Sequence, residues 1–173
     1  MSSYEIGYIT GITVVIFIFG ISAMFYKKRN VKPVYDERQT LARLKAYKNA
    51  FWVLMSYISI VCVVLGPLDI VFADITTIGF IGIALAGSVL AISCIFSDCY
   101  FGINQQPKRY IRLLTAIAIG NIMIFITNIK DGGSIIEGGI LTYKSIHIIG
   151  AVMIIAIVTA LMIKQRISEE SDL

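Results

Sequence analysis

Charged residues are scarce in this sequence. Asp, Glu, Lys and Arg make up 15% of its 173 residues, whereas hydrophobic residues make up 57% and the mean hydropathy is +0.82. A soluble domain carries about a quarter charged residues and has too small an interior to bury this much apolar surface. The shortage of charge therefore excludes an ordinary soluble domain and predicts a membrane protein.

Residues that bind metals or perform catalysis are also few. His147 is the only histidine, and Cys62, Cys94 and Cys99 form neither a CxxC pair nor the spacing of a zinc site. No GxSxG or HExxH motif occurs. The cysteines are expected to be free thiols that pack as small hydrophobes. The sequence names no catalytic, metal-binding or cofactor-binding residue, so a binding or accessory protein is favoured over an enzyme.

Five apolar windows are long enough to cross a bilayer as helices, which takes about 20 residues each. They cover roughly residues 5–26, 49–66, 76–96, 111–129 and 143–163. No polar linker divides the chain, so residues 1–173 are expected to form a single membrane domain. The predicted fold class is an all-α membrane protein with five transmembrane helices.

The basic residues predict the orientation of these helices. Of the 15 Lys and Arg residues, all but Lys130 and Lys144 fall in the segments 27–48, 97–112 and 164–173. Because cytoplasmic loops are enriched in Lys and Arg, these segments are predicted to be cytoplasmic. The N-terminus is then outside and the C-terminus in the cytoplasm. Basic residues at the ends of apolar segments meet lipid, so no nucleic-acid partner is expected despite the net charge of +4.

A charged stretch, residues 36–48, runs into the second window without an intervening Gly or Pro. Asp36 is a good N-cap and Gln39 completes a capping-box pattern, so a helix is predicted to begin near Glu37 and to end before Gly66. Charge on all sides of this helix favours an upright passage through the headgroup layer. Its cations include Arg38, Arg43, Lys45 and Lys48. These side chains either do no more than set the topology, or they contact a partner protein or anionic lipid.

The same stretch carries a resemblance. The run Asp36-Glu37-Arg38-Gln39, followed by residues 42–52, resembles a stretch of small uncharacterised multi-pass membrane proteins of Gram-positive bacteria. The resemblance carries no known activity. It implies a location in the bacterial plasma membrane.

The third window has small residues on two opposite sides. One side carries Gly79, Gly82, Ala86, Ser93 and Ser97, and the other carries Ala84, Gly87, Ser88 and Ala91. Small residues allow membrane helices to approach closely, where lipid supplies no hydrophobic drive for association. We therefore expect the third helix to be central, with a neighbour on each side.

A few polar residues are candidates for function. Asn121, deep in a predicted span, favours a hydrogen bond between helices, with a ligand-lining role as the alternative. His147 is expected to pack near the outer interface, or else to make a pH-sensitive contact. Asp69 and Asp74 suggest a solvated outer turn, with an outer cation site as the alternative. The glycine-rich segment 131–139 is interpreted as a flexible connector.

These patterns favour a non-enzymatic integral membrane protein that acts by association, either as an accessory or regulatory subunit or as an immunity-type protein. The alternatives are a small oligomeric transporter or channel lined by Asn121 and the outer acids, and a membrane enzyme without a recognisable motif. The expected partners are the lipid bilayer, anionic lipid at the cytoplasmic face, and another membrane protein or a second copy of the chain. The absence of carboxylates deep in the spans argues against proton-coupled transport.

Overall fold

The computed structural model describes residues 33–103, 107–130 and 134–171, and this part of the chain is mostly helical. Its long helices are α2 (Glu37–Ser59), which continues into the π-helical segment η1 (Ile60–Leu65), then α3 (Ile75–Phe96), α4 (Pro107–Lys130) and α5 (Ile146–Ser171). These described residues therefore contain four helices that are long and apolar enough to cross a membrane. The first predicted span, residues 5–26, lies outside the described residues.

The second helix begins and ends where the sequence predicted. Glu37–Leu65 is one stretch of 29 residues, about 43 Å long at 1.5 Å per residue. Its first turn is closed by a capping box, in which the Asp36 carboxylate accepts from the Gln39 backbone N–H at 2.6 Å. The Gln39 side-chain oxygen accepts from the Asp36 backbone N–H at 3.3 Å. The last helix differs more, because α5 continues past residue 163 to Ser171 through residues that favour helix.

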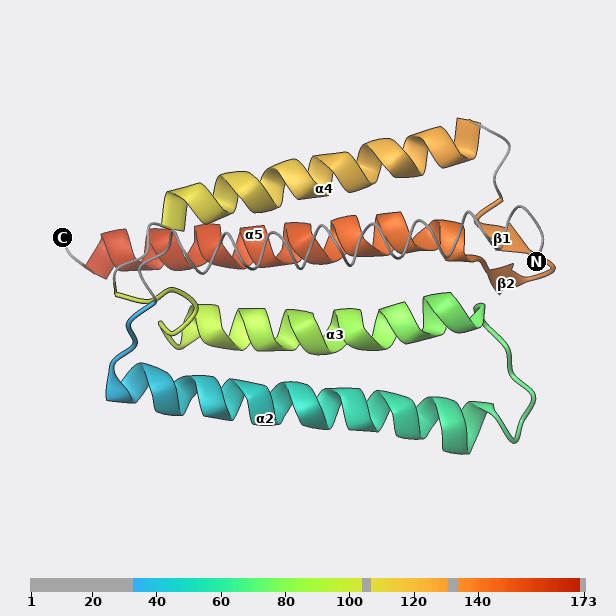
Figure 1. Ribbon diagram of the computed structural model, residues 1–173, viewed down its shortest axis with the longest axis horizontal. Coiled ribbons are helices and arrows are strands. Elements are labelled where there is room, and N and C mark those ends of the chain that lie inside the picture. Colours follow the sequence, from blue (N-terminus) through green and yellow to red (C-terminus); the bar gives the residue numbers. More distant parts are fainter. Residues whose placement is uncertain (1–32, 104–106, 131–133, 172–173) are drawn as a thin grey trace, which may run out of the picture. The chain divides into compact units, whose positions relative to one another are not determined.

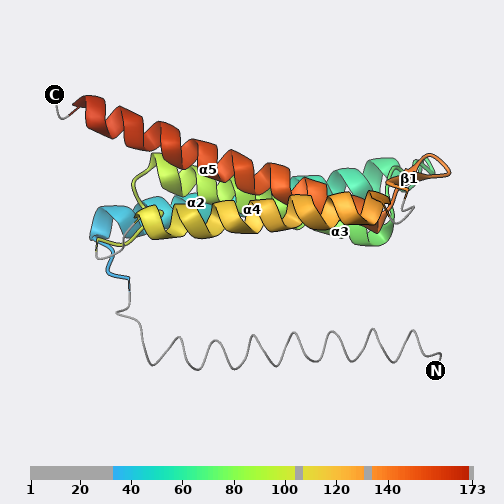
Figure 2. The same ribbon diagram turned by 90° about the horizontal axis from the view of Figure 1, so that it is seen from above.

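Val34–Leu173 forms one compact unit of the chain. The inner helices of this unit are α3 and α5 (Figure 1). Helix α3 packs against α2 and α5, and α5 packs in turn against α4. Helices α4 and α5 cross at an angle rather than running parallel (Figure 2). Helix α3 therefore has a neighbour on each side, and it shares the inner position with α5.

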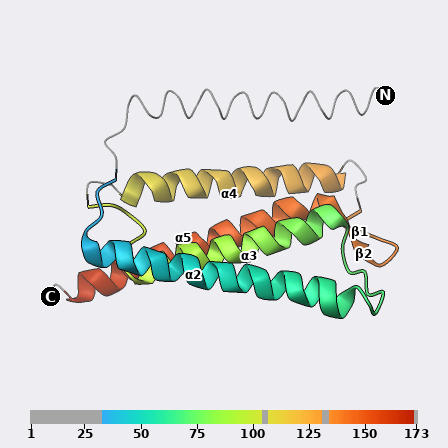
Figure 3. The same ribbon diagram turned by 60° about the horizontal axis from the view of Figure 1, so that its bottom comes forward.

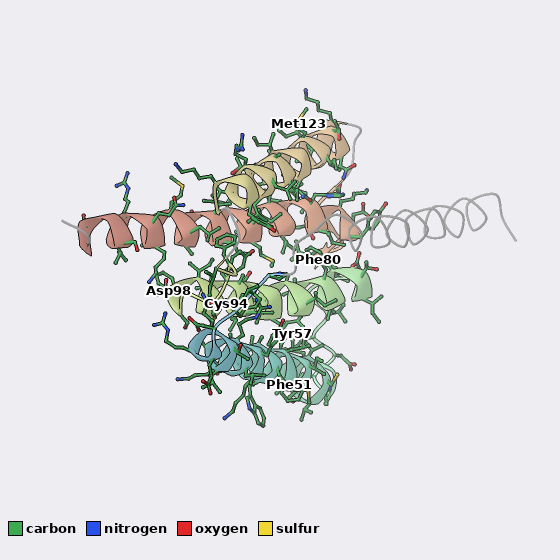
Figure 4. The ribbon with its side chains drawn as sticks, turned by 60° about the vertical axis from the view of Figure 1, so that its left-hand side comes forward. Phe51, Tyr57, Phe80, Cys94, Asp98 and Met123 are labelled. Carbon is green, nitrogen blue, oxygen red and sulfur yellow. The ribbon has the colours of Figure 1, made fainter. Side chains whose placement is uncertain are left out.

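Small residues on α3 differ in what they contact. At Gly82 the ring of Tyr57 comes so close that an added Cβ would lie 2.8 Å from Cδ1 and Cε1. The Tyr57 hydroxyl donates to the Ile78 carbonyl oxygen at 2.7 Å, which fixes the ring between α2 and α3 (Figure 4). Gly79 and Gly87 have no heavy atom within 4 Å of their Cβ positions among the described residues. Only part of the small-residue pattern therefore mediates close packing here.

Helix α3 ends in a Schellman motif. The Cys99 N–H donates to the Cys94 carbonyl oxygen at 2.9 Å and the Asp98 N–H donates to that of Ile95 at 3.3 Å. Asp98 takes the left-handed position at φ 55°, which Gly usually occupies. Cys94 and Cys99 pack with Ala46 of α2 in a buried cluster, and the three cysteines are free thiols.

At the opposite end of the bundle, part of the segment interpreted as a flexible connector is a hairpin. Strands β1 (Ile136–Glu137) and β2 (Ile140–Leu141) pair antiparallel. Gly138 and Gly139 form the two-residue turn at φ 60° and 83°, as a type I′ turn requires. The interpretation as a flexible connector was wrong for residues 136–139, which are part of this hairpin. Two consecutive glycines can adopt the positive φ angles that its turn needs. A short 3₁₀ helix, η2 (Tyr143–Ser145), leads into α5.

Candidate functional site

A groove runs along α3 where it packs against α5. Helix α2 lies on the other side of α3 (Figure 3). Its volume is about 650 Å³, which lies within the usual range for ligand pockets. Its walls are almost entirely apolar, formed by Phe80, Ile83, Ala84, Gly87, Leu90, Ala91 and Cys94 of α3 and by Gly150, Met153, Ile154 and Ile157 of α5. Among the described residues that line it, Arg, Tyr and Asn side chains lie only at its two ends.

One end of the groove is formed by Arg43 and Tyr47 of α2 and by Tyr100, which follows α3. The Arg43 guanidinium carbon lies 4.2 Å from the ring centroid of Tyr35, and Nη2 donates to the Tyr47 hydroxyl at 3.5 Å. A guanidinium has five N–H donors, so most of them have no acceptor among the described residues. Burial raises the pKa of Tyr100, with the nearby Cys94 and Tyr110 adding to the effect, so its hydroxyl stays neutral. This end is therefore cationic and aromatic.

The other end is formed by Phe80, Gly150 and Asn121. The Asn121 amide donates from Nδ2 to the Ile117 carbonyl oxygen at 3.0 Å, within its own helix. Its Oδ1 lies 3.3 Å from Nδ1 of His147, on α5. The structure thus brings together two residues that the sequence singled out separately. Their contact ties α4 to α5 beside the groove.

Comparison of the chain with protein-family models, with curated proteins and with solved structures found no match.

The other predicted cations lie away from the groove. Arg38, Lys45 and Lys48 are exposed on α2, and none of them lines the groove. Of the four cations proposed from the sequence, only Arg43 is partly buried and placed at a cavity. The reason is rotation around α2, since Arg43 lies on the same side as the buried Ala46 and Ala50, three and seven residues further on.

Asp69 and Asp74 have separate roles. Asp74 is the N-cap of α3 and accepts from the Thr77 N–H at 2.6 Å. Partial desolvation opposes ionisation of this carboxyl, but hydrogen bonds from Thr77, Tyr143 and Thr76 outweigh it and lower its pKa. Asp69 is exposed in the preceding turn at φ 53°. The interpretation as a solvated turn was therefore incomplete for Asp74, because its carboxylate caps a helix.

The segment around Asp74 is paired with the hairpin. The Leu141 N–H donates to the Phe72 carbonyl oxygen at 3.0 Å, and the Asp74 N–H donates to the Leu141 carbonyl oxygen at 2.8 Å. Ala73, between them, is 1% exposed. These contacts hold two loops together at this end of the unit, and none of their residues lines the groove.

Gln39 is a positioning residue that the sequence identified only as a cap. Its Nε2 donates to the Asp98 carbonyl oxygen at 2.7 Å, and Asp98 also pairs with Lys164 of α5 at 3.0 Å. The Ile103 N–H donates to the Val34 carbonyl oxygen at 2.9 Å nearby. These contacts hold the start of α2 against the end of α3 beside Arg43. In the sequence, the signal for this role was a polar side chain at the third position of the helix.

Proposed function

We propose that this protein is a non-enzymatic integral membrane protein that acts by association, by holding a membrane component in the groove along α3. The observation that carries the proposal is the groove itself, which has apolar walls and an arginine at one end. Accessory or regulatory subunits and immunity-type proteins both act by binding of this kind.

The proposed topology is five spans, with the N-terminus outside and the C-terminus in the cytoplasm of a bacterial cell. The distribution of basic residues over the described helices supports this orientation. The ends of the helices near Arg43 also carry Arg38, Lys45, Lys48, Lys108, Arg112, Lys164 and Arg166, and the opposite ends carry Lys130 and Lys144. The DERQ-type resemblance supports a plasma-membrane location.

Labelling of intact cells with a membrane-impermeant maleimide tests this topology. In a chain whose three native cysteines are replaced by alanine, Ser3→Cys and Ser134→Cys are expected to react in intact cells, whereas Ile167→Cys should react only after permeabilisation. Reaction of Ile167→Cys in intact cells would show that the orientation is opposite to the proposed one. If Ser3→Cys is protected while Ser134→Cys reacts, the chain has four spans and not five.

The exposed cations of α2 support a second contact within the same proposal. Arg38, Lys45 and Lys48 would meet anionic headgroups of the cytoplasmic leaflet, where each cation contributes about 1 kcal/mol. A transporter pathway is less well supported. It needs Asn121 and the outer acids to line one path, but the Asp74 carboxylate caps α3 and neither acid lines the groove.

Photochemical cross-linking tests association at the groove. A diazirine side chain in place of Gly87 would lie in the groove, and one in place of Gly79 provides the control, since Gly79 is equally open but does not line it. After irradiation of membranes, the probe at Gly87 is expected to give one dominant adduct, of protein or of lipid, resolved by mass spectrometry. If the probes at Gly87 and Gly79 both give a mixture of adducts with no dominant one, the proposed function is overturned.

A further inference from the structure

The charge at the Arg43 end of the groove indicates what kind of molecule would bind. Among the described residues Arg43 makes a cation–π contact with Tyr35 and one hydrogen bond of 3.5 Å to Tyr47, and it pairs with no carboxylate. Arg recognises phosphate groups particularly well, because its planar fork can donate two parallel hydrogen bonds. A partly buried arginine with unused donors therefore favours an anionic group at this end.

The length of the groove indicates the rest of the molecule. From Cys94 at the Arg43 end to Phe80 at the other, α3 advances 14 residues, or about 21 Å. The hydrocarbon core of a bilayer is about 30 Å thick, so the groove is longer than the roughly 15 Å of one leaflet's hydrocarbon and can hold an acyl chain of that leaflet. The walls between these ends are apolar and include the open surface at Gly87. An acyl chain needs only such walls, since it has no polar group to satisfy.

We propose that the groove binds an anionic phospholipid of the cytoplasmic leaflet, with its phosphate at Arg43 and one acyl chain along α3 toward Phe80. This inference rests on the proposed function and names the ligand class for the same site. Tyr47 and Tyr100 flank the headgroup, as interfacial aromatic residues commonly do. Gly87 leaves room for the chain, because a larger side chain there would extend into the groove.

The test uses the full chain in phosphatidylcholine vesicles that contain a minor fraction of phosphatidylglycerol with a diazirine in its acyl chain. Irradiation is expected to label α3 peptides between Ile83 and Ala91. Arg43→Gln should reduce this labelling roughly ten-fold, as expected for loss of a charge-assisted hydrogen bond. Arg112→Gln, at an exposed arginine of α4 that does not line the groove, should retain it. Gly87→Leu should abolish the labelling and Gly79→Leu should not. Labelled phosphatidylcholine should label the same peptides far less.

The outcomes separate this inference from the proposed function. Equal labelling by the two lipids, or full labelling of Arg43→Gln, would overturn the anionic lipid. A dominant protein adduct from the probe at Gly87, whether to a partner, a second copy or residues 5–26, would also overturn it. An adduct to a partner or a second copy would still agree with the proposed function, association at the groove. An adduct to residues 5–26 would contradict both the proposed function and the anionic lipid. Circular dichroism of each variant checks that the helices are retained.

Discussion

Gln39 donates a hydrogen bond from its side-chain Nε2 to the backbone carbonyl oxygen of Asp98, 2.7 Å away and 59 residues further along the chain. The same glutamine completes the capping box of α2. One side chain therefore begins a helix and holds the end of α3 against it. This contact joins the first turn of α2, four residues before Arg43, to the residues that follow α3.

Replacement of Gln39 is therefore expected to destabilise the fold. Gln39→Ala should lower the free energy of unfolding by about 1–2 kcal/mol, since the Asp98 carbonyl loses its donor and the cap loses one hydrogen bond. Arg38→Ala, at the exposed neighbouring position, should stay within about 0.5 kcal/mol of the parent. Unfolding by sodium dodecyl sulfate, followed by circular dichroism, measures both. Equal stabilities would contradict a structural role for Gln39.

The close approach of α2 and α3 should make Gly82 intolerant of a methyl group. Gly82→Ala would place its Cβ 2.8 Å from two ring atoms of Tyr57, so we expect a loss of about 1–3 kcal/mol. Gly79→Ala meets open space on the same helix, and removal of a helical glycine should be neutral or stabilise by up to about 1 kcal/mol. The same unfolding titration compares the two. A neutral Gly82→Ala would show that the helices can separate at little cost.

The left-handed conformation of Asp98 predicts a difference between two variants that both lose the Lys164 ion pair. Asp98→Gly removes the steric conflict at φ 55°, whereas Asp98→Ala retains it. We expect the glycine variant to be more stable than the alanine variant by about 1–2 kcal/mol. Thermal unfolding of the two proteins in the same detergent checks the order, and the reverse order would exclude this conformation.

The Asn121–His147 contact should couple α4 to α5. In a double-mutant cycle with Asn121→Leu and His147→Leu, the expected coupling is about 0.6 kcal/mol, the average for hydrogen bonds between membrane helices. Asn128→Leu is a suitable control for loss of an amide, since the Asn128 side chain makes no hydrogen bond within the described part of the chain. Additive effects of the two main substitutions would mean that the 3.3 Å contact contributes nothing.

The lowered pKa of Asp74 predicts a loss of stability in acid. Because its pKa is lower in the folded than in the unfolded state, its contribution is present above the unfolded-state value of about 4 and disappears as pH falls through the folded-state value. Asp74→Asn keeps a capping oxygen but no charge, so its stability should depend less on pH in this range. Unfolding titrations between neutral and acidic pH measure the slopes. Identical slopes would contradict the shift.

Much of the fold could be predicted from local patterns. Apolar windows located the four described long helices, and Asp36 with Gln39 placed the start of α2 at Glu37. These predictions succeed because helix length, caps and stops depend on residues within a few positions of one another. The hairpin at Gly138-Gly139 was locally encoded as well, but the glycines were interpreted as flexibility rather than as a turn.

The groove and its contacts depended on the tertiary structure. The sequence identified Arg43 among four similar cations, and it identified Asn121 and His147 separately. Only the packing of α2, α3, α4 and α5 placed Arg43 at a groove and brought Asn121 to 3.3 Å from His147. Hydropathy and caps are properties of single segments, whereas a groove depends on the rotation and separation of several helices. Small residues permit more than one such arrangement, and the Tyr57 ring at Gly82 shows which one forms.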